Sequence, residues 1–148
     1  PELTALINAA YNDEINLWIA SGYRSVEEQE NVLNRAVQRR MADGMTYEKA
    51  YEDARLTIQE PGYSEHHTGL AVDFNDVADD FRETKAYTWL QEHAEEYGFI
   101  ERYPKDKESV TGIDYEPWHY RYVGKEHAQR MNELHMCLEE YVAFLEGN

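Results

Sequence analysis

Ser64-Glu65-His66-His67-Thr68-Gly69-Leu70-Ala71-Val72-Asp73 is a stretch rich in metal-binding side chains, and Glu116-Pro117-Trp118-His119 follows it later in the chain. Catalytic zinc commonly takes three protein ligands, drawn from histidine nitrogens and carboxylate oxygens, and keeps a fourth position for water. His66, Asp73 and His119 meet that requirement. Glu116 lies three residues before His119, where it can exchange protons without being a ligand. The two segments together predict the site of a zinc hydrolase.

The segment from residue 69 to residue 74 has the alternation of a β-strand. Large apolar side chains at positions 70, 72 and 74 alternate with Gly69, Ala71 and Asp73. Successive side chains of a strand point to opposite faces, so Asp73 shares its face with small neighbours. That face has room for a metal and a bound ligand beside the carboxylate.

The rest of the chain shows signals for both helices and strands. Ser25 and Glu28 form a capping box, Thr46 can cap the next helix, and Gly98 is placed to end another. We expect helices over residues 1–11, 26–43, 46–59, 84–97 and 126–146, and strands over residues 15–20, 69–74, 99–102 and 118–123. This mixture lacks a regular strand–helix alternation. It predicts an α+β fold in which helices flank a small, mostly antiparallel sheet.

The composition is that of one globular domain over residues 1–148. Apolar residues make up 42% of the chain and aromatic residues 13%, which is too rich for a disordered segment. The net charge of −16 disfavours nucleic acid and anionic lipid surfaces as partners. No run approaches the ~20 apolar residues of a membrane span, and we expect membrane attachment only through a signal or anchor removed upstream of Pro1. The single cysteine, Cys137, is expected to be buried.

Three further polar residues are candidates for the site. Arg24 follows the first predicted strand and precedes a helix, and its guanidinium can stabilise charge that develops on a substrate carbonyl oxygen. Ser64 and Gln29 are weaker candidates for binding a substrate carboxylate or peptide group. We expect structural or solvent-exposed roles for the remaining histidines, His67, His93, His127 and His135.

Two histidines and one carboxylate also describe the metal site of iron(II) oxygenases. In that class the first histidine and the acid are typically separated by a single residue, whereas His66 and Asp73 are seven positions apart. The spacing therefore disfavours an oxygenase. Trp118 and its aromatic neighbours at positions 120 and 122 alternate with His119, so we expect these rings to pack beneath the site rather than to contact substrate.

The pattern Ser64-x-His66-x-x-Gly69-x-Ala71-x-Asp73, with Glu116-x-Trp118-His119, resembles the signature of the LAS metallopeptidases, in particular the VanY-type D-alanyl-D-alanine carboxypeptidases. The resemblance extends over most of the chain from about residue 15. Further matching segments are Ser21-Gly22-Tyr23-Arg24-Ser25, Gly98-Phe99-Ile100, Arg102-Tyr103-Pro104 and the run from Glu116 to Gly124. A Hedgehog/DD-peptidase-like fold is implied by this resemblance.

The resemblance also implies roles for individual residues. Zn²⁺ would be held by His66, Asp73 and His119, with Glu116 as catalytic base and Arg24 assisting at the scissile carbonyl. The substrate would be a peptidoglycan stem peptide or precursor that ends in D-Ala. Many relatives carry Gln where this chain has His67, a departure at the rim of the site that could alter substrate contacts or supply another ligand.

Several alternatives share this set of residues. They are an L,D-carboxypeptidase acting on tetrapeptides, a D,D-dipeptidase acting on free D-Ala-D-Ala as in vancomycin resistance, and a non-enzymatic zinc-containing module that binds peptidoglycan. We expect selectivity to reside in the loops 75–83 and 105–114. We expect a monomer in the bacterial cell envelope outside the cytoplasm, or in the cytoplasm if the substrate is a precursor.

Overall fold

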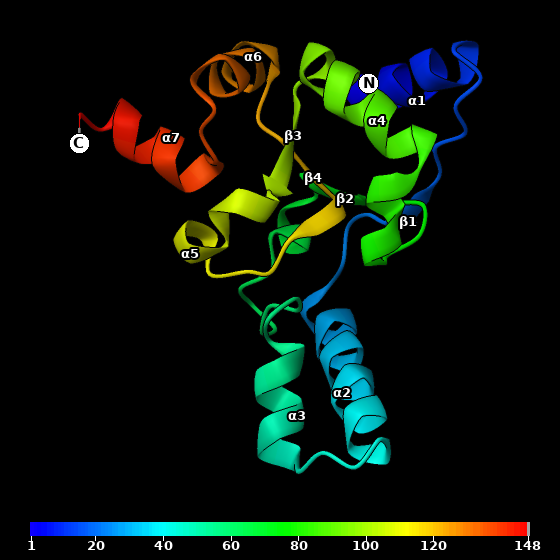
Figure 1. Ribbon diagram of the computed structural model, residues 1–148, viewed down its shortest axis with the longest axis vertical. Helices are drawn as coiled ribbons and strands as arrows, with labels where there is room; N and C mark the ends of the chain where they lie inside the picture. The colour runs from blue at the N-terminus through cyan, green and yellow to red at the C-terminus, as the bar shows by residue number, and fades with distance from the viewer. Residues whose placement is uncertain (148) are drawn as a thin grey trace.

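A four-stranded antiparallel sheet with strand order β1-β2-β4-β3 forms the centre of the protein. The computed structural model describes residues 1–147 (Figure 1). The strands are β1 (Ile19–Ser21), β2 (Ala71–Phe74), β3 (Phe99–Tyr103) and β4 (Glu116–Tyr122). The α-helices are α1 (Glu2–Asn12), α2 (Val26–Ala42), α3 (Tyr47–Ala54), α4 (Lys85–His93), α5 (Glu108–Thr111), α6 (Lys125–Leu134) and α7 (Leu138–Leu145). Short 3₁₀ helices are η1 (Glu65–Thr68), η2 (Asp79–Glu83), η3 (Ala94–Tyr97) and η4 (Lys105–Lys107). The predicted α+β fold with a small antiparallel sheet is therefore confirmed.

The register of the sheet brings distant polar residues together. Asp73 on β2 pairs with His119 on β4, and Ser21 on β1 pairs with Asp73 from the other side. Directly opposed residues of an antiparallel pair have Cβ atoms about 5 Å apart. Two predicted metal ligands are thus neighbours because of backbone pairing alone.

An irregularity in the β3–β4 pairing places Glu116 on the face that carries His119. Tyr120 pairs with Glu101 and Glu116 pairs with Tyr103, so four steps along β4 match two steps along β3. In a regular strand, residues three apart would point to opposite faces. Local departures of this kind commonly redirect a side chain next to a functional site.

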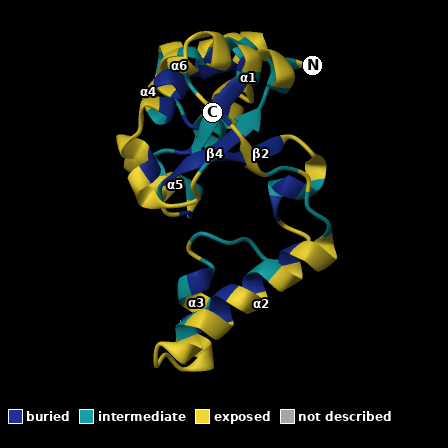
Figure 2. Cartoon of the chain, turned by 90° about the vertical axis from the view of Figure 1, so that its right-hand side faces the viewer, coloured by how far each residue is buried: buried dark blue, intermediate teal, exposed yellow. Residues whose placement is uncertain are grey.

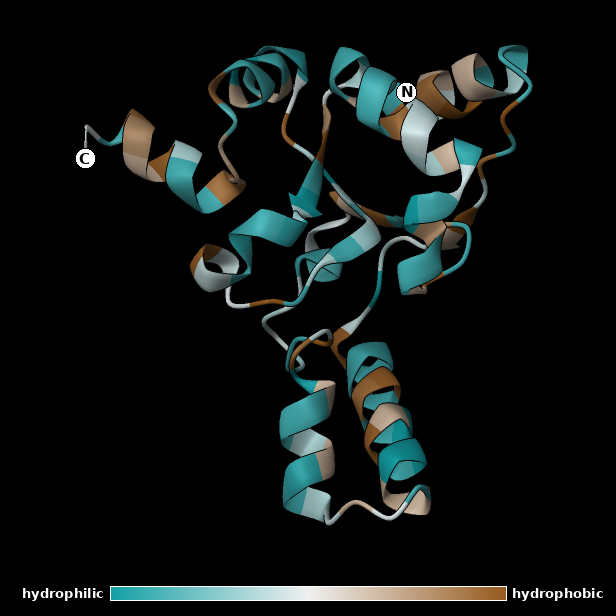
Figure 3. Cartoon of the chain, in the orientation of Figure 1, coloured by the Kyte–Doolittle hydropathy of each residue, from teal (hydrophilic) through white to brown (hydrophobic). Residues whose placement is uncertain are grey.

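The opposite face of the sheet is covered by α1 and α4 (Figure 1). Val72 and Phe74 on β2 and Trp118 and Tyr120 on β4 pack there. Helical residues complete this cluster, including Leu6, Ala10, Trp89 and Leu90. Figure 3 shows apolar segments in α1, whereas α6 is mostly hydrophilic on its surface. The face opposite to the predicted ligands is thus an apolar core, as the alternation around Asp73 predicts.

The helices α2 and α3 form a hairpin that projects from the sheet and has an apolar seam of its own (Figure 2). Its buried residues are Leu33, Ala36, Val37, Ala50 and Ala54. Small alanines let the two helices approach closely. At the edge of the sheet formed by β3, α6 and α7 pack around Ile100 through Met131 and Tyr141.

The first predicted strand is shorter than expected, because residues 15–18 are not part of a strand. Asn75 explains the difference. Its side chain accepts a hydrogen bond from the amide of Trp18 and donates one to the carbonyl of Asn16. Asn75 has a left-handed backbone with φ 56°. Side-chain hydrogen bonds therefore replace the sheet ladder in this segment.

The second predicted helix was expected to reach residue 59, but α3 ends at Ala54. Beyond it, the carbonyl of Leu56 accepts from the amide of Asp114, and the carbonyl of Gln59 accepts from the side chain of Gln29. Long-range hydrogen bonds thus replace helical ones.

The last predicted helix, residues 126–146, is divided into α6 and α7. His135 takes a left-handed conformation with φ 53° and ends α6. Cys137 then begins α7, and the carboxylate of Glu140 accepts from its backbone amide. Cys137 is buried, as predicted. Within residues 1–147, no helix combines the length and the apolar character needed to cross a membrane.

Candidate metal centre

His66, Asp73 and His119 come together at one buried point of the sheet. One ligand atom from each residue lies within 4.8 Å of those of the other two. Each residue is at most 5% exposed. Asp73 comes from β2, His119 from β4 and His66 from η1, the turn that leads into β2. The three predicted ligands therefore form a compact set of two nitrogens and one carboxylate.

Local hydrogen bonds fix the turn that carries His66. Ser64 caps η1, and its hydroxyl accepts from the amide of His66 at 3.3 Å. Gly69 ends the turn with φ 74°, a left-handed conformation that glycine adopts without steric cost. The chain then enters β2, so the spacing between His66 and Asp73 is spanned by one turn.

Each histidine directs one ring nitrogen toward Asp73 and uses the other in a hydrogen bond. His66 donates from Nδ1 to the carbonyl of Gly22 at 2.8 Å, and its Nε2 lies 3.3 Å from Asp73 Oδ2. In His119, Nε2 lies 2.8 Å from Oε1 of Glu65, and Nδ1 lies 2.8 Å from Oδ1 of Asp73. Metal-binding histidines commonly have such outer partners, which set the ring orientation. The donor set and its supports fit Zn²⁺.

Glu116 lies beside this set. Its Oε2 is 3.8 Å from His119 Nδ1, and the residue is 3% exposed. Burial raises the pKa of Glu116 to about 8; His119 lowers it, while the carboxylates of Asp73 and Glu65 raise it further. The carboxyl group therefore lies close to the predicted ligands, and its raised pKa is of the kind found in groups that exchange protons.

The predicted ligands shift one another's pKa values through their hydrogen bonds. Burial alone would lower the pKa of His119, but its hydrogen bonds with Asp73 and Glu65 raise it to about 10. Burial would raise the pKa of Asp73, but its hydrogen bonds with the two histidines hold it below its usual range. Asp73 is thus held as a carboxylate at the point where a cation can bind.

Arg24 reaches the same site from the segment after β1. Its guanidinium donates from Nη1 to Oε1 of Gln29 and from Nη2 to Oγ of Ser21, both at 2.6 Å. Nη2 also lies 3.8 Å from Asp73 Oδ2. Arg24 is therefore held next to the predicted metal position.

Gln29 has a different environment from the one expected of a substrate-binding residue. It is 1% exposed, its oxygen accepts from Arg24, and its amide donates to the carbonyl of Gln59 at 2.7 Å. Both polar atoms thus have partners within the chain. We interpret Gln29 as a residue that holds Arg24.

His67 is the residue that the sequence analysis expected at the rim of the site, as a departure from the family pattern. Its Nδ1 lies 2.7 Å from the carbonyl of Arg24, and its Nε2 accepts from the amide of Gly62 at 3.0 Å. Both ring nitrogens are therefore used to join the turn at Gly62 to Arg24, and neither faces the ligands.

A cleft of about 300 Å³ opens over the site. Ser64, Glu116 and the three predicted ligands line one part of it. A further wall is formed by α2 of the hairpin, with Val32, Arg39 and Arg40, and by the segment after α3, with Thr57, Ile58 and Gln59. Of the two loops expected to control selectivity, 75–83 contributes Val77, whereas 105–114, which is described in full, does not line the cleft. The hairpin wall is a feature that the sequence analysis missed.

Sequence analysis also missed the residues that surround His119. The carboxylate of Glu65 is hydrogen-bonded to Nε2 of His119. The ring of Tyr103 stacks on the His119 ring, with the two centroids 5.1 Å apart. Glu65 stands beside His66 in the motif, so its position was the only available signal. The prediction for the aromatic residues of β4 holds in part: Trp118 and Tyr120 pack in the core, but Trp118 also borders the cleft.

Comparison with known proteins shows which proteins this chain resembles over its length. The family model described as "VanY: D-alanyl-D-alanine carboxypeptidase" matches residues 1–125. A D-alanyl-D-alanine carboxypeptidase of Enterococcus faecalis is 44% identical over 144 residues, which cover 96% of this chain and 53% of that protein. The chain thus spans about half the length of this relative.

Two solved structures agree closely with the fold. A point mutant of the vancomycin-resistance D,D-pentapeptidase VanY in complex with Zn(II) has a TM-score of 0.88 at 44% identity, covering 96% of this chain and 80% of that one. VanYB in complex with D-alanine-D-alanine also has a TM-score of 0.88, at 43% identity, covering 97% and 79%. These matches extend over nearly the whole chain. The chain belongs to the VanY family of D-alanyl-D-alanine carboxypeptidases.

Proposed function

We propose that this chain is a zinc-dependent D-alanyl-D-alanine carboxypeptidase that removes the terminal D-Ala from peptidoglycan stem peptides or their precursors. One observation carries the proposal: His66, Asp73 and His119 form a buried donor set, with Glu116 and Arg24 beside it in one part of a cleft. A relative of the same family has been solved with D-alanine-D-alanine. That complex supports the choice of substrate class.

The proposed zinc ligands are Nε2 of His66, a carboxylate oxygen of Asp73 and Nδ1 of His119. Their outer partners, the carbonyl of Gly22 and the carboxylate of Glu65, leave these atoms free to face a cation. A related VanY structure contains Zn(II), which supports this choice of metal. When bound, zinc supplies a Lewis acid and lowers the pKa of a coordinated water.

Glu116 is the proposed general base and acid. Its carboxylate accepts a proton from the water that attacks the carbonyl before the terminal D-Ala. After the C–N bond breaks, Glu116 gives that proton to the departing amine. Its burial keeps bulk water from competing for the proton.

Arg24 is proposed to stabilise the negative charge that develops on the carbonyl oxygen. Ser21 and Gln29 fix its guanidinium, so the charge is oriented before substrate binds. Ser64 lines the cleft and can donate its hydroxyl to a substrate carboxylate or peptide group. Gln29 acts on the substrate only through Arg24.

The test is release of D-Ala from a pentapeptide, a tetrapeptide and free D-Ala-D-Ala, each with and without a chelator. We expect release from the pentapeptide, loss of that release with chelator, and recovery on addition of zinc. Preferred cleavage of the tetrapeptide would indicate an L,D-carboxypeptidase, and preferred cleavage of the free dipeptide a dipeptidase. No release from any substrate by the zinc-loaded protein would contradict the proposed enzymatic function.

The proposed substrate also bears on partners and location. Action on mature stem peptides places the domain in the cell envelope outside the cytoplasm, whereas action on precursors is compatible with the cytoplasm. The net charge of −16 supports a protein that does not bind nucleic acid. We propose that the chain acts as a monomer, because one copy supplies all the residues proposed for the site.

A further inference from the structure

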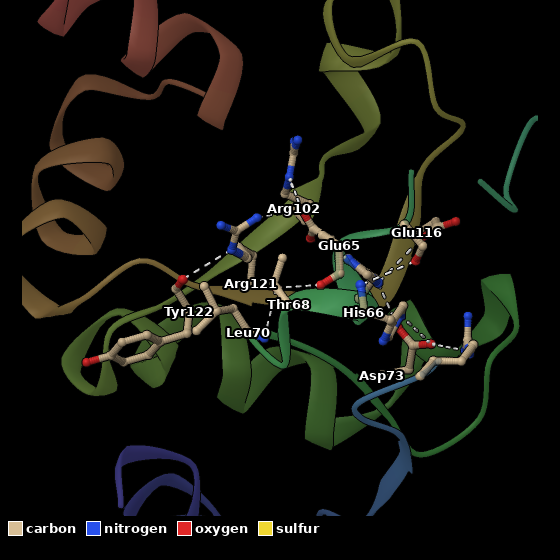
Figure 4. Close-up of polar contacts among 12 residues, drawn as sticks. Glu65, His66, Thr68, Leu70, Asp73, Arg102, Glu116, Arg121 and Tyr122 are labelled. Atoms are coloured by element: carbon tan, nitrogen blue, oxygen red, sulfur yellow. Dashed lines mark hydrogen bonds and ion pairs between the residues drawn. The ribbon is translucent and has the colours of Figure 1, made fainter. Parts of the chain in front are cut away.

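Glu65 joins the candidate metal centre to two arginines. Its Oε1 lies 2.8 Å from His119 Nε2, and its Oε2 accepts from Arg102 Nε at 3.0 Å and from Arg121 Nη1 at 2.9 Å. The Glu65 side chain is only 11% exposed. Figure 4 shows Arg102 and Arg121 near Glu65, with His66, Asp73 and Glu116 on its other side. Both carboxylate oxygens therefore have defined partners.

The Arg102 side chain extends this chain of contacts to α7. Its Nη1 and Nη2 donate to the two carboxylate oxygens of Glu139 at 2.8 and 3.0 Å. This two-point contact fixes the guanidinium in orientation as well as in position. The guanidinium also lies over the ring of Tyr103, 4.7 Å from its centroid, and Tyr103 stacks on His119. Glu139 lies beyond residue 125, where the family match ends.

The charges along this path alternate in sign. A buried carboxylate is costly unless it is paired and hydrogen-bonded, and the two arginines provide that pairing for Glu65. Glu139 in turn faces Arg102, so the guanidinium is held from both sides. A carboxylate fixed in this way can keep a proton on Nε2 of His119, so that Nδ1, on the side of Asp73, is the nitrogen left for a metal.

We propose that Glu65 is a positioning residue that orients His119 for metal binding, and that α7 supports Glu65 through Glu139 and Arg102. This inference rests on the proposed metal-binding role of His119. Glu65 does not touch the substrate or the reacting atoms, so its effect is on the metal affinity and geometry of the site. Glu139 acts one step further away and has a smaller effect.

The experiment measures zinc affinity by competition with a chromophoric chelator, using metal-free protein. Four variants are compared with the wild type: Glu65→Ala, Glu65→Gln, Glu139→Gln and Glu140→Gln. Glu140 is the matched control, because it lies next to Glu139 on α7 and pairs with Lys107 rather than with Arg102. The glutamine can still accept from the amide of Cys137, so the start of α7 is kept.

Loss of an outer partner commonly weakens metal binding about 10- to 100-fold, and we expect a loss in that range for Glu65→Ala. Glu65→Gln should lose less, since its amide oxygen still accepts from His119. Glu139→Gln should bind zinc a few-fold more weakly than Glu140→Gln, which should match the wild type. The visible spectrum of the cobalt(II)-loaded protein should change in Glu65→Ala and not in Glu140→Gln.

Wild-type zinc affinity and an unchanged cobalt spectrum in folded Glu65→Ala would overturn the role of Glu65. If that variant does not fold, Glu65→Gln takes its place: it loses the charge that pairs with Arg102 and Arg121, and wild-type affinity in it would overturn the proposal that this pairing fixes Glu65 for His119. Equal affinities of Glu139→Gln and Glu140→Gln would overturn the role of α7. The readouts are independent of turnover, so zinc-binding protein that releases no D-Ala would contradict the proposed function and leave this inference standing.

Discussion

Arg24 donates a 2.6 Å hydrogen bond from Nη1 to Oε1 of Gln29, a residue that is 1% exposed at the base of α2. The side-chain amide of Gln29 also donates to the carbonyl of Gln59, where the chain returns from the α2–α3 hairpin. Gln29 thus connects the guanidinium at the proposed reaction centre with the wall of the cleft. The orientation of Arg24 depends on a residue that has no free polar atom for the substrate.

Gln29→Ala should therefore reduce kcat while zinc content stays stoichiometric. Removing one partner of a buried hydrogen bond costs about 1 to 3 kcal/mol. If about half of that cost falls on the transition state, we expect kcat to fall roughly two- to tenfold. The measurement is steady-state D-Ala release together with metal analysis. Gln38→Ala, on the exposed side of α2, should behave as the wild type. Equal kcat in both variants would exclude Gln29 as the support of Arg24.

Gly98 is a position where a side chain should not fit. It has φ 86°, and an added Cβ would lie 2.8 Å from Cε1 of Tyr122 and 3.0 Å from the backbone carbon of Gly124. Gly112 has a similar φ of 75° but no neighbour within 4 Å of the corresponding position. The left-handed backbone costs an alanine about 1 kcal/mol at either site. The difference in stability between the two alanine variants therefore measures the steric clash at position 98.

We expect Gly98→Ala to lose about 1 to 3 kcal/mol more than Gly112→Ala, the usual range for overpacking. Urea unfolding of the two variants measures this difference. Similar losses would show that Tyr122 moves aside without cost.

Glu101 should make the stability of the protein depend on pH. Burial raises its pKa from 4.5 to about 7, although hydrogen bonds from Tyr87 and Gln91 lower it in part. The folded protein therefore holds this proton more tightly than the unfolded chain does. The contribution of Glu101 to stability is fully present below about pH 4.5 and is lost as the pH rises through 7.

Glu101→Gln removes this titration and keeps an acceptor for Tyr87. The free energy of unfolding of the variant, relative to the wild type, should rise between pH 4.5 and pH 8 by at most about 3 kcal/mol. Denaturant unfolding at several pH values measures it, with the exposed Glu30→Gln as control. A difference that does not vary with pH would contradict the buried environment of Glu101.

The sequence was informative where local chemistry determines the structure. The capping box of Ser25 and Glu28 begins α2 as predicted, and the alternation around Asp73 separates the apolar core from the polar face. The sequence predicted that His66, Asp73 and His119 form one metal-binding set, and the fold brings these three side chains together. Their roles as ligands remain a proposal.

The remaining features depend on contacts between distant segments. Glu65 has no local pattern that distinguishes it from the other acidic residues of the chain, and its partners come from β3 and β4. The side chain of Asn75 accepts a hydrogen bond from Trp18, 57 positions away in the sequence, and β1 is shorter as a result. The break at His135 requires a left-handed backbone at a residue that is not glycine. None of these follows from periodicity or capping signals.

Glu116 is proposed to move protons at a metal site that it does not help to hold. The most direct measurement compares Glu116→Ala with the wild type for bound zinc and for D-Ala release from a pentapeptide. We predict one equivalent of zinc in both proteins and loss of D-Ala release in the variant. Zinc-loaded Glu116→Ala with undiminished release would contradict the account.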